Sequence, residues 1–212
     1  LKFWYYLYMK GNGEKDTYHH GDLKRTLISE GRALLDEDGY EGFSLRKLAK
    51  RIGVTAMAPY RHFATKEQLC AAIVDDAFDR FAEALADSIS ADFSTHEKLI
   101  RMLIGYVRFF VKNPDILKIL FVEVKNRNSL MRNLHQTEDL GDTYRHIRSF
   151  HMLSSLAEQL ASEDPAVNAE ELILTAWSRV HGLAVLLSQE TWIFNADNVS
   201  DETLRRIIQT GI

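Results

Sequence analysis

Hydrophobic residues recur at steps of three and four positions along most of the 212-residue chain. That spacing places them on one face of an α-helix, whereas a half-buried strand needs alternation at every second position, and no stretch sustains such alternation. The pattern predicts an all-α protein. Helices are expected at about 21–38, 45–52, 55–63, 66–90, 95–112, 114–121, 144–162, 168–190 and 200–209.

Capping and breaking residues predict where these helices begin and end. Ser44 and Thr95 are expected N-caps, because a side-chain hydroxyl can accept a hydrogen bond from an unpaired N–H of the first turn. Glycine ends helices readily and proline cannot continue them. The expected breaks are Gly39, Gly53, Asn113-Pro114 and Asp164-Pro165. Residues 125–143 lose the helical spacing, which predicts a loop or a broken helix there.

The segment 44–66 predicts two short helices joined by a tight turn. Gly53 ends the first helix, because glycine adopts left-handed backbone conformations most easily. The second helix opens near Thr55, and Pro59 keeps it short because proline is tolerated only near a helix's first turn. Two helices that cross after a brief glycine-bearing turn form a helix-turn-helix, which lays its second helix in the major groove of DNA.

The distribution of charge supports the same interpretation. The net charge of the chain is −4, yet residues 44–66 hold six basic and no acidic residues. A compact positive segment in an acidic chain suits contact with phosphates. A solvated helix face is the alternative explanation of a charge run.

Two sets of residues resemble one protein family. The run YHHGDLKRTLISEGRALLDEDGYEGFSLRKLAKRIGV, followed by Tyr60-Arg61-His62-Phe63 and Lys66, resembles the DNA-binding domain of the TetR (tetracycline-repressor) family of bacterial transcriptional regulators. Further on, Trp177, His181 and Gly182 in AWSRVHGLAVL resemble the C-terminal domain of one subgroup of that family. The resemblance implies an N-terminal three-helix helix-turn-helix domain and a C-terminal helical ligand-binding and dimerisation domain. The expected parts are a mobile extension at 1–17, the DNA-binding domain at 18–66, a connecting helix at 67–90 and the regulatory and dimerisation domain at 91–212.

The resemblance also implies roles for individual residues around the turn. Phosphates would be anchored by Tyr60, His62 and Lys66, and the DNA backbone would be gripped from the first helix by Ser44 and Arg46. Bases would be read by Thr55, Ala56, Met57, Ala58 and Arg61. The small alanines allow contact with thymine methyl groups, and an arginine can pair with guanine.

The helices after residue 90 carry two further hypotheses. The middle helices are rich in aromatic residues with few polar groups, which is typical of a pocket for a small apolar molecule, although ordinary core packing gives the same spacing. The pocket candidates are Met102, Tyr106, Phe109, Phe110, Phe121, Phe150, Trp177 and His181. The family resemblance implies a homodimer, with candidate interface residues Leu172, Ala176, Val180, Leu183, Leu187, Leu204, Ile207 and Ile208.

These observations predict a cytoplasmic, ligand-responsive regulator, a repressor more readily than an activator, that binds a near-palindromic operator as a homodimer. No catalytic residues, metal or cofactor are expected, because HExxH, GxSxG and P-loop spacings are absent from the sequence. No apolar run reaches the roughly 18 residues that span a bilayer. An all-α enzyme and a helical protein-interaction module remain as alternatives.

Overall fold

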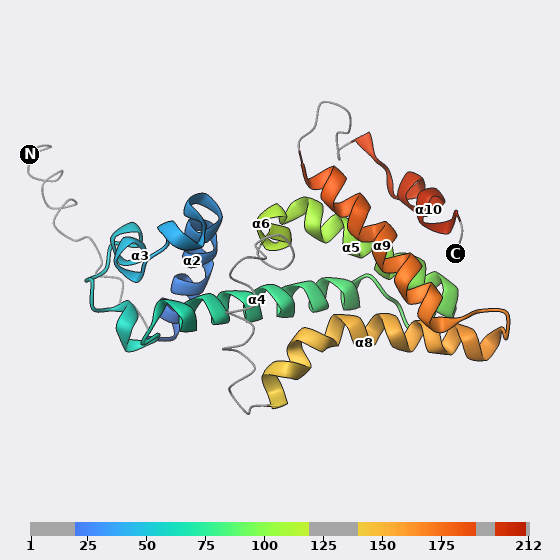
Figure 1. The fold of residues 1–212 in the computed structure, drawn as a ribbon, viewed down its shortest axis with the longest axis horizontal. Helices are drawn as coiled ribbons and strands as arrows, with labels where there is room; N and C mark the ends of the chain where they lie inside the picture. Colours follow the sequence, from blue (N-terminus) through green and yellow to red (C-terminus); the bar gives the residue numbers. More distant parts are fainter. Residues whose placement is uncertain (1–19, 119–139, 190–197, 211–212) are drawn as a thin grey trace, which may run out of the picture.

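The computed structural model describes residues 20–118, 140–189 and 198–210, and within those ranges it contains helices and no strand (Figure 1). The predicted all-α fold is therefore confirmed. In chain order the elements are α2 (His20–Gly42), α3 (Leu45–Arg51), the 3-10 turn η1 (Pro59–Arg61), α4 (Lys66–Asp87), α5 (Thr95–Lys112), α6 (Pro114–Leu117), α8 (Leu140–Glu163), α9 (Ala169–Ser188) and α10 (Asp201–Gln209). The predicted N-terminal extension and Phe121 lie outside the described residues.

Helix ends at the helix-turn-helix follow the local chemistry that the sequence indicated. Ser44 caps α3, and its hydroxyl accepts a hydrogen bond of 3.2 Å from the Lys47 N–H. Gly53 follows α3 with a φ of 72°, in the left-handed region that favours glycine. Gly39 also has a positive φ, with φ 66° and ψ 173°, and it interrupts α2, which resumes for one short turn to Gly42.

Two predicted boundaries in the C-terminal part were wrong. The N-cap of α5 is Ser94, whose hydroxyl accepts from the Glu97 N–H, and Thr95 is the first residue inside the helix. Thr95 is buried and donates a hydrogen bond of 2.6 Å to Glu163. The other correction concerns residues 125–143, because α8 already begins at Leu140, while residues 119–139 are outside the described part of the chain.

The predicted helix at 55–63 is instead a series of tight turns. The Ala58 N–H donates to the Thr55 carbonyl at 2.9 Å, and a single 3-10 turn follows at Pro59–Arg61. Pro59 explains the difference, because an α-helix would require an N–H at residue 59 to bond to the Thr55 carbonyl and proline has none. The three-residue bond from Ala58 takes that acceptor, and the segment 55–61 becomes a short, blunt projection.

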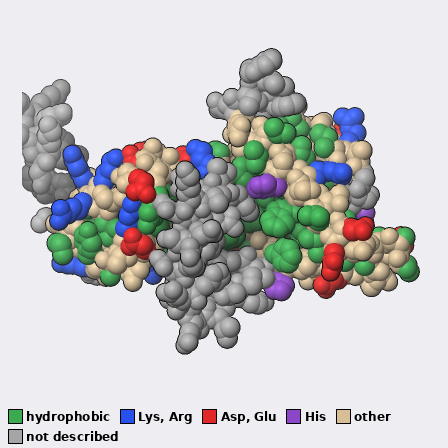
Figure 2. Space-filling view, viewed as in Figure 1, with side chains coloured by type: hydrophobic (Ala, Val, Ile, Leu, Met, Phe, Trp, Pro, Cys, Tyr) green, Lys and Arg blue, Asp and Glu red, His purple; other side chains and the backbone are tan. Residues whose placement is uncertain are grey.

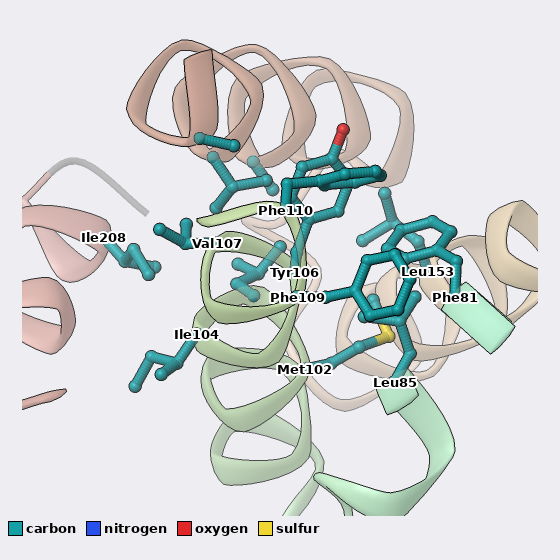
Figure 3. Close-up of a cluster of buried hydrophobic side chains, with 14 of the residues drawn as sticks. Phe81, Leu85, Met102, Ile104, Tyr106, Val107, Phe109, Phe110, Leu153 and Ile208 are labelled. Atoms are coloured by element: carbon teal, nitrogen blue, oxygen red, sulfur yellow. The ribbon is translucent and has the colours of Figure 1, made fainter. Parts of the chain in front are cut away.

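Helix α4 belongs to both hydrophobic cores. Its first half contributes Leu69 and Ile73 to a small core with α2 and α3. Its second half contributes Phe81 and Leu85 to a larger core with α5, α8, α9 and α10 (Figure 3). Since one continuous helix is packed into both cores, a movement of α4 displaces the N-terminal helices relative to the rest.

Ion pairs also connect distant elements. Arg32 and Asp36 of α2 pair with Asp115 at 2.8 Å and with Lys118 at 2.7 Å, which ties α2 to α6 and the residue after it. At the other end of the molecule, Arg205 of α10 donates to both carboxylate oxygens of Glu97, at 2.5 and 2.7 Å. Together with Arg101, this bidentate contact lowers the pKa of Glu97 to about 2.

Candidate DNA interface

The segment after α3 presents most of the predicted base-reading residues to solvent. Thr55, Ala56, Met57 and Arg61 are exposed, and Ala58 is half-buried. The segment is anchored from below, because Pro59 is buried and Phe63 lies in the small core. A rigid base and an exposed outer edge are what insertion into a groove requires.

The predicted phosphate-contacting residues lie around this segment. Tyr60 is exposed and His62 is half-buried, one on each side of Arg61. Ser44 and Arg46 are exposed at the start of α3. The Ser44 hydroxyl already accepts the capping bond, and it keeps its own O–H free for donation.

Acidic residues of α2 neutralise part of the basic segment. Lys47 pairs with Asp38 at 2.6 Å. Arg51 pairs with Glu30 at 3.0 Å and with Glu37 at 2.6 Å, and these two carboxylates raise the pKa of Arg51 above its ordinary value. These two cations serve the packing of α3 on α2 and are less available to phosphates than the sequence suggested.

Lys66 is turned toward the protein. Its ammonium donates to the Tyr40 carbonyl oxygen and lies over the Tyr40 ring, 4.0 Å from the ring centre. The Tyr40 hydroxyl in turn donates to Glu67 at 3.2 Å. Burial and the Glu67 carboxylate raise the pKa of Tyr40 to about 12. The cluster fixes the start of α4 against the end of α2, and Lys66 has two further N–H groups with which to contact a phosphate.

Among the six basic residues of segment 44–66, the three that are exposed and form no ion pair with a described residue are Arg46, Lys50 and Arg61. All three are exposed. Figure 2 shows lysine and arginine side chains gathered at the end of the molecule that holds α2 and α3. We call Arg46, Lys50 and Arg61 the unpaired cations. Lys50 belongs to the basic segment 44–66, but it was not among the residues predicted to contact DNA.

The predicted pocket residues divide into two groups. Met102, Tyr106, Phe109 and Phe110 are buried in the larger core, where Phe81 contacts three of the rings at centroid distances of 4.8 to 5.3 Å (Figure 3). Phe150 and Trp177 are exposed, and their rings meet edge to face at 6.4 Å. His181, half-buried on α9, contacts the first group through Tyr106.

A polar contact lies inside these aromatic surroundings. The Tyr106 hydroxyl is 2.9 Å from Nδ1 of His181. Burial raises the pKa of Tyr106 and lowers the pKa of His181, so both are neutral near pH 7. A neutral imidazole and a phenol can each donate or accept, which suits a polar group on an otherwise apolar ligand.

The structure assigns most of the predicted dimer residues to the core of the same chain. Leu172, Ala176, Val180, Leu187, Leu204 and Ile208 are all buried in the single protomer. Because these side chains expose at most 9% of their surface, they offer little area to a second copy, and the interface stays a prediction. Leu183 is partly buried, and Ile207 alone of the eight is exposed.

An exposed apolar face was missed on the other side of α9. Leu174 is 69% exposed and Leu186 is 50% exposed, with the exposed Trp177 beside them. Gly182 lies between, and a Cβ added there would meet nothing within 4 Å. We call Leu174, Trp177, Gly182 and Leu186 the outer α9 face. Figure 2 shows hydrophobic side chains gathered over α8 and α9. The spacing of these residues along one side of a helix was the feature of the sequence that could have predicted this face.

Comparison with known proteins identifies the N-terminal part. Residues 27–73 match a family model described as bacterial regulatory proteins, tetR family. Helix-turn-helix transcriptional regulators from Staphylococcus aureus strains USA300 and NCTC 8325 are each 27% identical over 88 residues, which are 41% of this chain and 47% of theirs. The chain therefore spans about half the length of the curated relatives it matches. Both relatives are described as transcriptional regulators.

Solved structures resemble the described fold over nearly its whole length. A protein of unknown function from Rhodococcus sp. RHA1 has a TM-score of 0.68 at 24% identity and covers 92% of this chain and 96% of its own. A putative TetR family regulator from Vibrio parahaemolyticus has a TM-score of 0.62 at 19% identity, with coverage of 87% and 96%. The fatty acid degradation regulator FadR from Bacillus halodurans has a TM-score of 0.64 at 13% identity, with coverage of 89% and 95%. At these identities the likeness concerns the fold.

Proposed function

Because residues 27–73 match the model of the tetR family of bacterial regulatory proteins, we propose that the chain is a transcriptional repressor that binds a near-palindromic DNA operator as a homodimer and leaves it when a small molecule binds. The observation that carries the proposal is the segment 55–61, which presents Thr55, Ala56, Met57 and Arg61 to solvent above the buried Pro59 and contacts the helix that carries the unpaired Arg46 and Lys50. A cytoplasmic location accompanies the proposal, because bacterial operators lie there.

Salt dependence tests the DNA-binding part. Each phosphate neutralised on duplex DNA contributes about −0.9 to the slope of log K against log salt concentration. The two unpaired cations assigned to phosphates, Arg46 and Lys50, therefore predict for two protomers a slope of about −4 on an operator duplex. The operator can be selected from a random duplex pool and binding measured by fluorescence anisotropy. A slope near zero, or the absence of any enriched sequence, contradicts the proposal.

Substitution of Arg61 tests whether this residue recognises a base or only contacts a phosphate. It stands next to the turn, where its guanidinium could reach a guanine edge. Arg61→Ala should therefore change the preferred base at one position of the selected half-site as well as weaken binding. Arg46→Ala is the matched control, since a phosphate contact on α3 should weaken binding to all sequences by a similar factor. An unchanged preference in Arg61→Ala removes this residue from base reading.

A second copy of the chain is the proposed occupant of the outer α9 face. One blunt projection covers only a few base pairs, and helix-turn-helix proteins gain specificity by placing two units on half-sites about 34 Å apart or a multiple of that distance. The face is apolar at both ends, and at its centre Ser178 and Gly182 are small enough for a partner helix to approach closely. Its exposed leucines would be costly to leave in water.

Glutamate substitutions distinguish this face from α10. Leu174→Glu together with Leu186→Glu should convert the dimer to a folded monomer in analytical ultracentrifugation, because two charges would be desolvated on the contact. Ile207→Glu, at an exposed apolar position on α10, is the matched control and should leave the dimer intact. A dimer that survives the first pair but is lost with Ile207→Glu places the interface on α10 instead.

The effector site that we propose lies beside Tyr106, His181, Phe150 and Trp177, between α5, α8 and α9. The polar contact between Tyr106 and His181 supplies a hydrogen-bonding group within an aromatic surrounding. The fatty acid degradation regulator with the same fold makes long-chain acyl compounds a sensible part of a first ligand screen. A ligand that binds the folded state raises the melting temperature, and Trp177→Ala should reduce that increase.

Release from DNA would pass through the contacts of α2 with its neighbours. α4 is packed into both cores, and α6 holds α2 through the pairs Arg32–Asp115 and Asp36–Lys118. A ligand that favours a different placement of these helices changes the spacing of the two projections and lowers DNA affinity. Coupling of about 1 to 3 kcal/mol, or roughly 5- to 150-fold in affinity, suffices. Ligand titration of operator-bound protein measures it.

A further inference from the structure

Three consecutive residues after α3 form an exposed apolar tip. Ala56 and Met57 are the central residues of the turn that the Ala58 N–H closes on the Thr55 carbonyl, at 2.9 Å. Met57 is 67% exposed, one of the two most exposed large hydrophobic side chains among the described residues. We call Ala56, Met57 and Ala58 the apolar tip. One exposed apolar side chain is ordinary by itself, so a binding role for the tip has to follow from how it is held and from the charges near it.

The tip is held firmly rather than projecting as a loose loop. Pro59, directly after it, is buried, and the N–H groups of His62 and Phe63 both donate to the Pro59 carbonyl at 3.0 Å. Phe63 is buried in the small core. The position of Met57 is therefore fixed by the fold, while its own unbranched side chain can adapt to the surface it meets.

Charge indicates what the tip faces. Helix α3, which carries Arg46 and Lys50, contacts the η1 turn that follows the tip and carries Arg61, and none of the three cations has an ion pair with a described residue. Cations beside an apolar centre fit DNA, with Arg46 and Lys50 on the phosphates and the apolar centre, beside Arg61, on the floor of the groove. An apolar protein partner would not call for three uncompensated positive charges around its contact.

The hydrogen-bonding capacity of the tip indicates which base it can recognise. The tip itself has no side-chain donor or acceptor apart from the weakly accepting thioether of Met57, and its neighbours Thr55 and Arg61 supply the strong donors. Among the base edges of the major groove, the 5-methyl group of thymine is the one apolar feature. Polar edges opposite the tip would lose water without gaining a partner, which is unfavourable.

We propose that Met57 is a specificity-determining residue that reads thymine through its methyl group, so that the operator carries at least one thymine opposite the tip in each half-site. This inference rests on the proposed function and specifies its target: a half-site recognised by apolar contact at its centre, with Arg61 adding one polar contact.

Uracil substitution isolates the methyl group. Replacing a thymine by deoxyuridine removes the 5-methyl group and leaves both base pairing and the hydrogen-bonding pattern unchanged. The probe is the duplex that the full-length protein selects from a random pool, with each thymine replaced in turn. At the thymine opposite Met57, binding should weaken about fourfold per half-site, the loss of one buried methyl group, which corresponds to about 0.8 kcal/mol.

Variants assign the effect to Met57. Met57→Ala should bind thymine and deoxyuridine duplexes equally, while Met57→Leu, which keeps the apolar volume, should retain at least half of the discrimination. Arg61→Ala is the matched control and should keep the fourfold effect. Met57 is exposed, so the variants should fold, and circular dichroism checks that they do.

The outcomes separate this inference from the proposed function. A selected operator whose affinity changes at no thymine on deoxyuridine substitution overturns the role of Met57 and leaves repression by DNA binding standing. A uracil effect of equal size in Met57→Ala and in the unaltered protein also overturns it. If no sequence is enriched at all, the proposed function itself fails.

Discussion

The crossing of α4 and α5 depends on Gly105, and this dependence can be measured. A Cβ added to Gly105 would lie 3.0 Å from both the Cβ and the Oγ of Ser88, and 3.8 Å from the Ala84 carbonyl oxygen. Comfortable carbon–carbon contacts begin near 3.5 Å. Because Ser88 caps the end of α4, the two helices must separate by about half an ångström to admit a methyl group.

The expected size of the effect combines two opposing contributions. Overpacking a filled contact costs about 1 to 3 kcal/mol. Alanine in place of glycine inside a helix recovers about 1 kcal/mol through helix propensity. Gly105→Ala alone should therefore lower the free energy of unfolding by about 0 to 2 kcal/mol, a range that reaches zero and so does not test the contact by itself.

A double-mutant cycle removes the propensity contribution. Ser88→Gly deletes both clashing atoms, and it loses the 2.6 Å bond from the Ser88 hydroxyl to the Leu85 carbonyl. In the double variant the new methyl group occupies the vacated space. The double variant should be more stable than the sum of the single effects predicts, by about 1 to 2 kcal/mol.

Urea unfolding followed by far-UV circular dichroism, at one fixed protein concentration, provides the four free energies. Additive effects within about 0.3 kcal/mol would refute the close-contact explanation. Gly31→Ala is the matched control, because its Cβ would also lie 3.0 Å from a neighbour, but that neighbour is the terminal methyl group of Ile73. The end of a flexible side chain can move, so Gly31→Ala should cost less than the clash at Gly105.

Three further predictions concern ion pairs and backbone conformation. Lys50→Ala should reduce the salt slope of operator binding by about 2 per dimer, whereas Arg51→Ala, whose cation is paired within the protein, should leave the slope unchanged and lower the melting temperature. The Glu97 pKa of about 2, below its ordinary 4.5, means that the contact with Arg205 stabilises above pH 4.5 and is lost as the pH falls toward 2; Glu97→Gln should flatten the stability–pH curve in that window. Gly39→Ala should lower the free energy of unfolding in urea by about 1 to 3 kcal/mol, since φ 66° and ψ 173° strain any residue with a Cβ.

Helix positions were predictable because local chemistry decides most of them. The hydroxyl at Ser44, the positive φ of Gly53 and the Asp164-Pro165 pair act within three or four residues of themselves. The helix at 55–63 failed for a local reason as well. The sequence predicted that Pro59 limits the length of the second helix. Whether the missing N–H of Pro59 leads to a shorter α-helix or to a 3-10 turn depends on how Pro59 and Phe63 are buried against the rest of the protein.

The number of available cations could not be read from the segment 44–66 alone. Its basic residues face acidic residues that lie earlier in the chain, and Arg51 reaches Glu30 across 21 positions of sequence. Only the packing of α3 against α2 decides which charges are cancelled. The sequence therefore indicated the right surface, while the structure reduced six candidate cations to three that are exposed and unpaired among the described residues.

The sequence alone also could not predict which face of α9 is covered by the same chain. The helix is apolar nearly all round, which indicates that more than one side is covered, but periodicity cannot tell a face covered by α5 and α8 from a face covered by another copy of the chain. The packing of α5 resolves it, since Ala176, Val180 and Ala184 are buried under α5 and its neighbours in the larger core. The opposite side, with Leu174 and Leu186, is then left in water. Within the part of the chain that the structure describes, nothing covers it, and the proposed pair of DNA-reading projections would give a second copy a physical reason to do so.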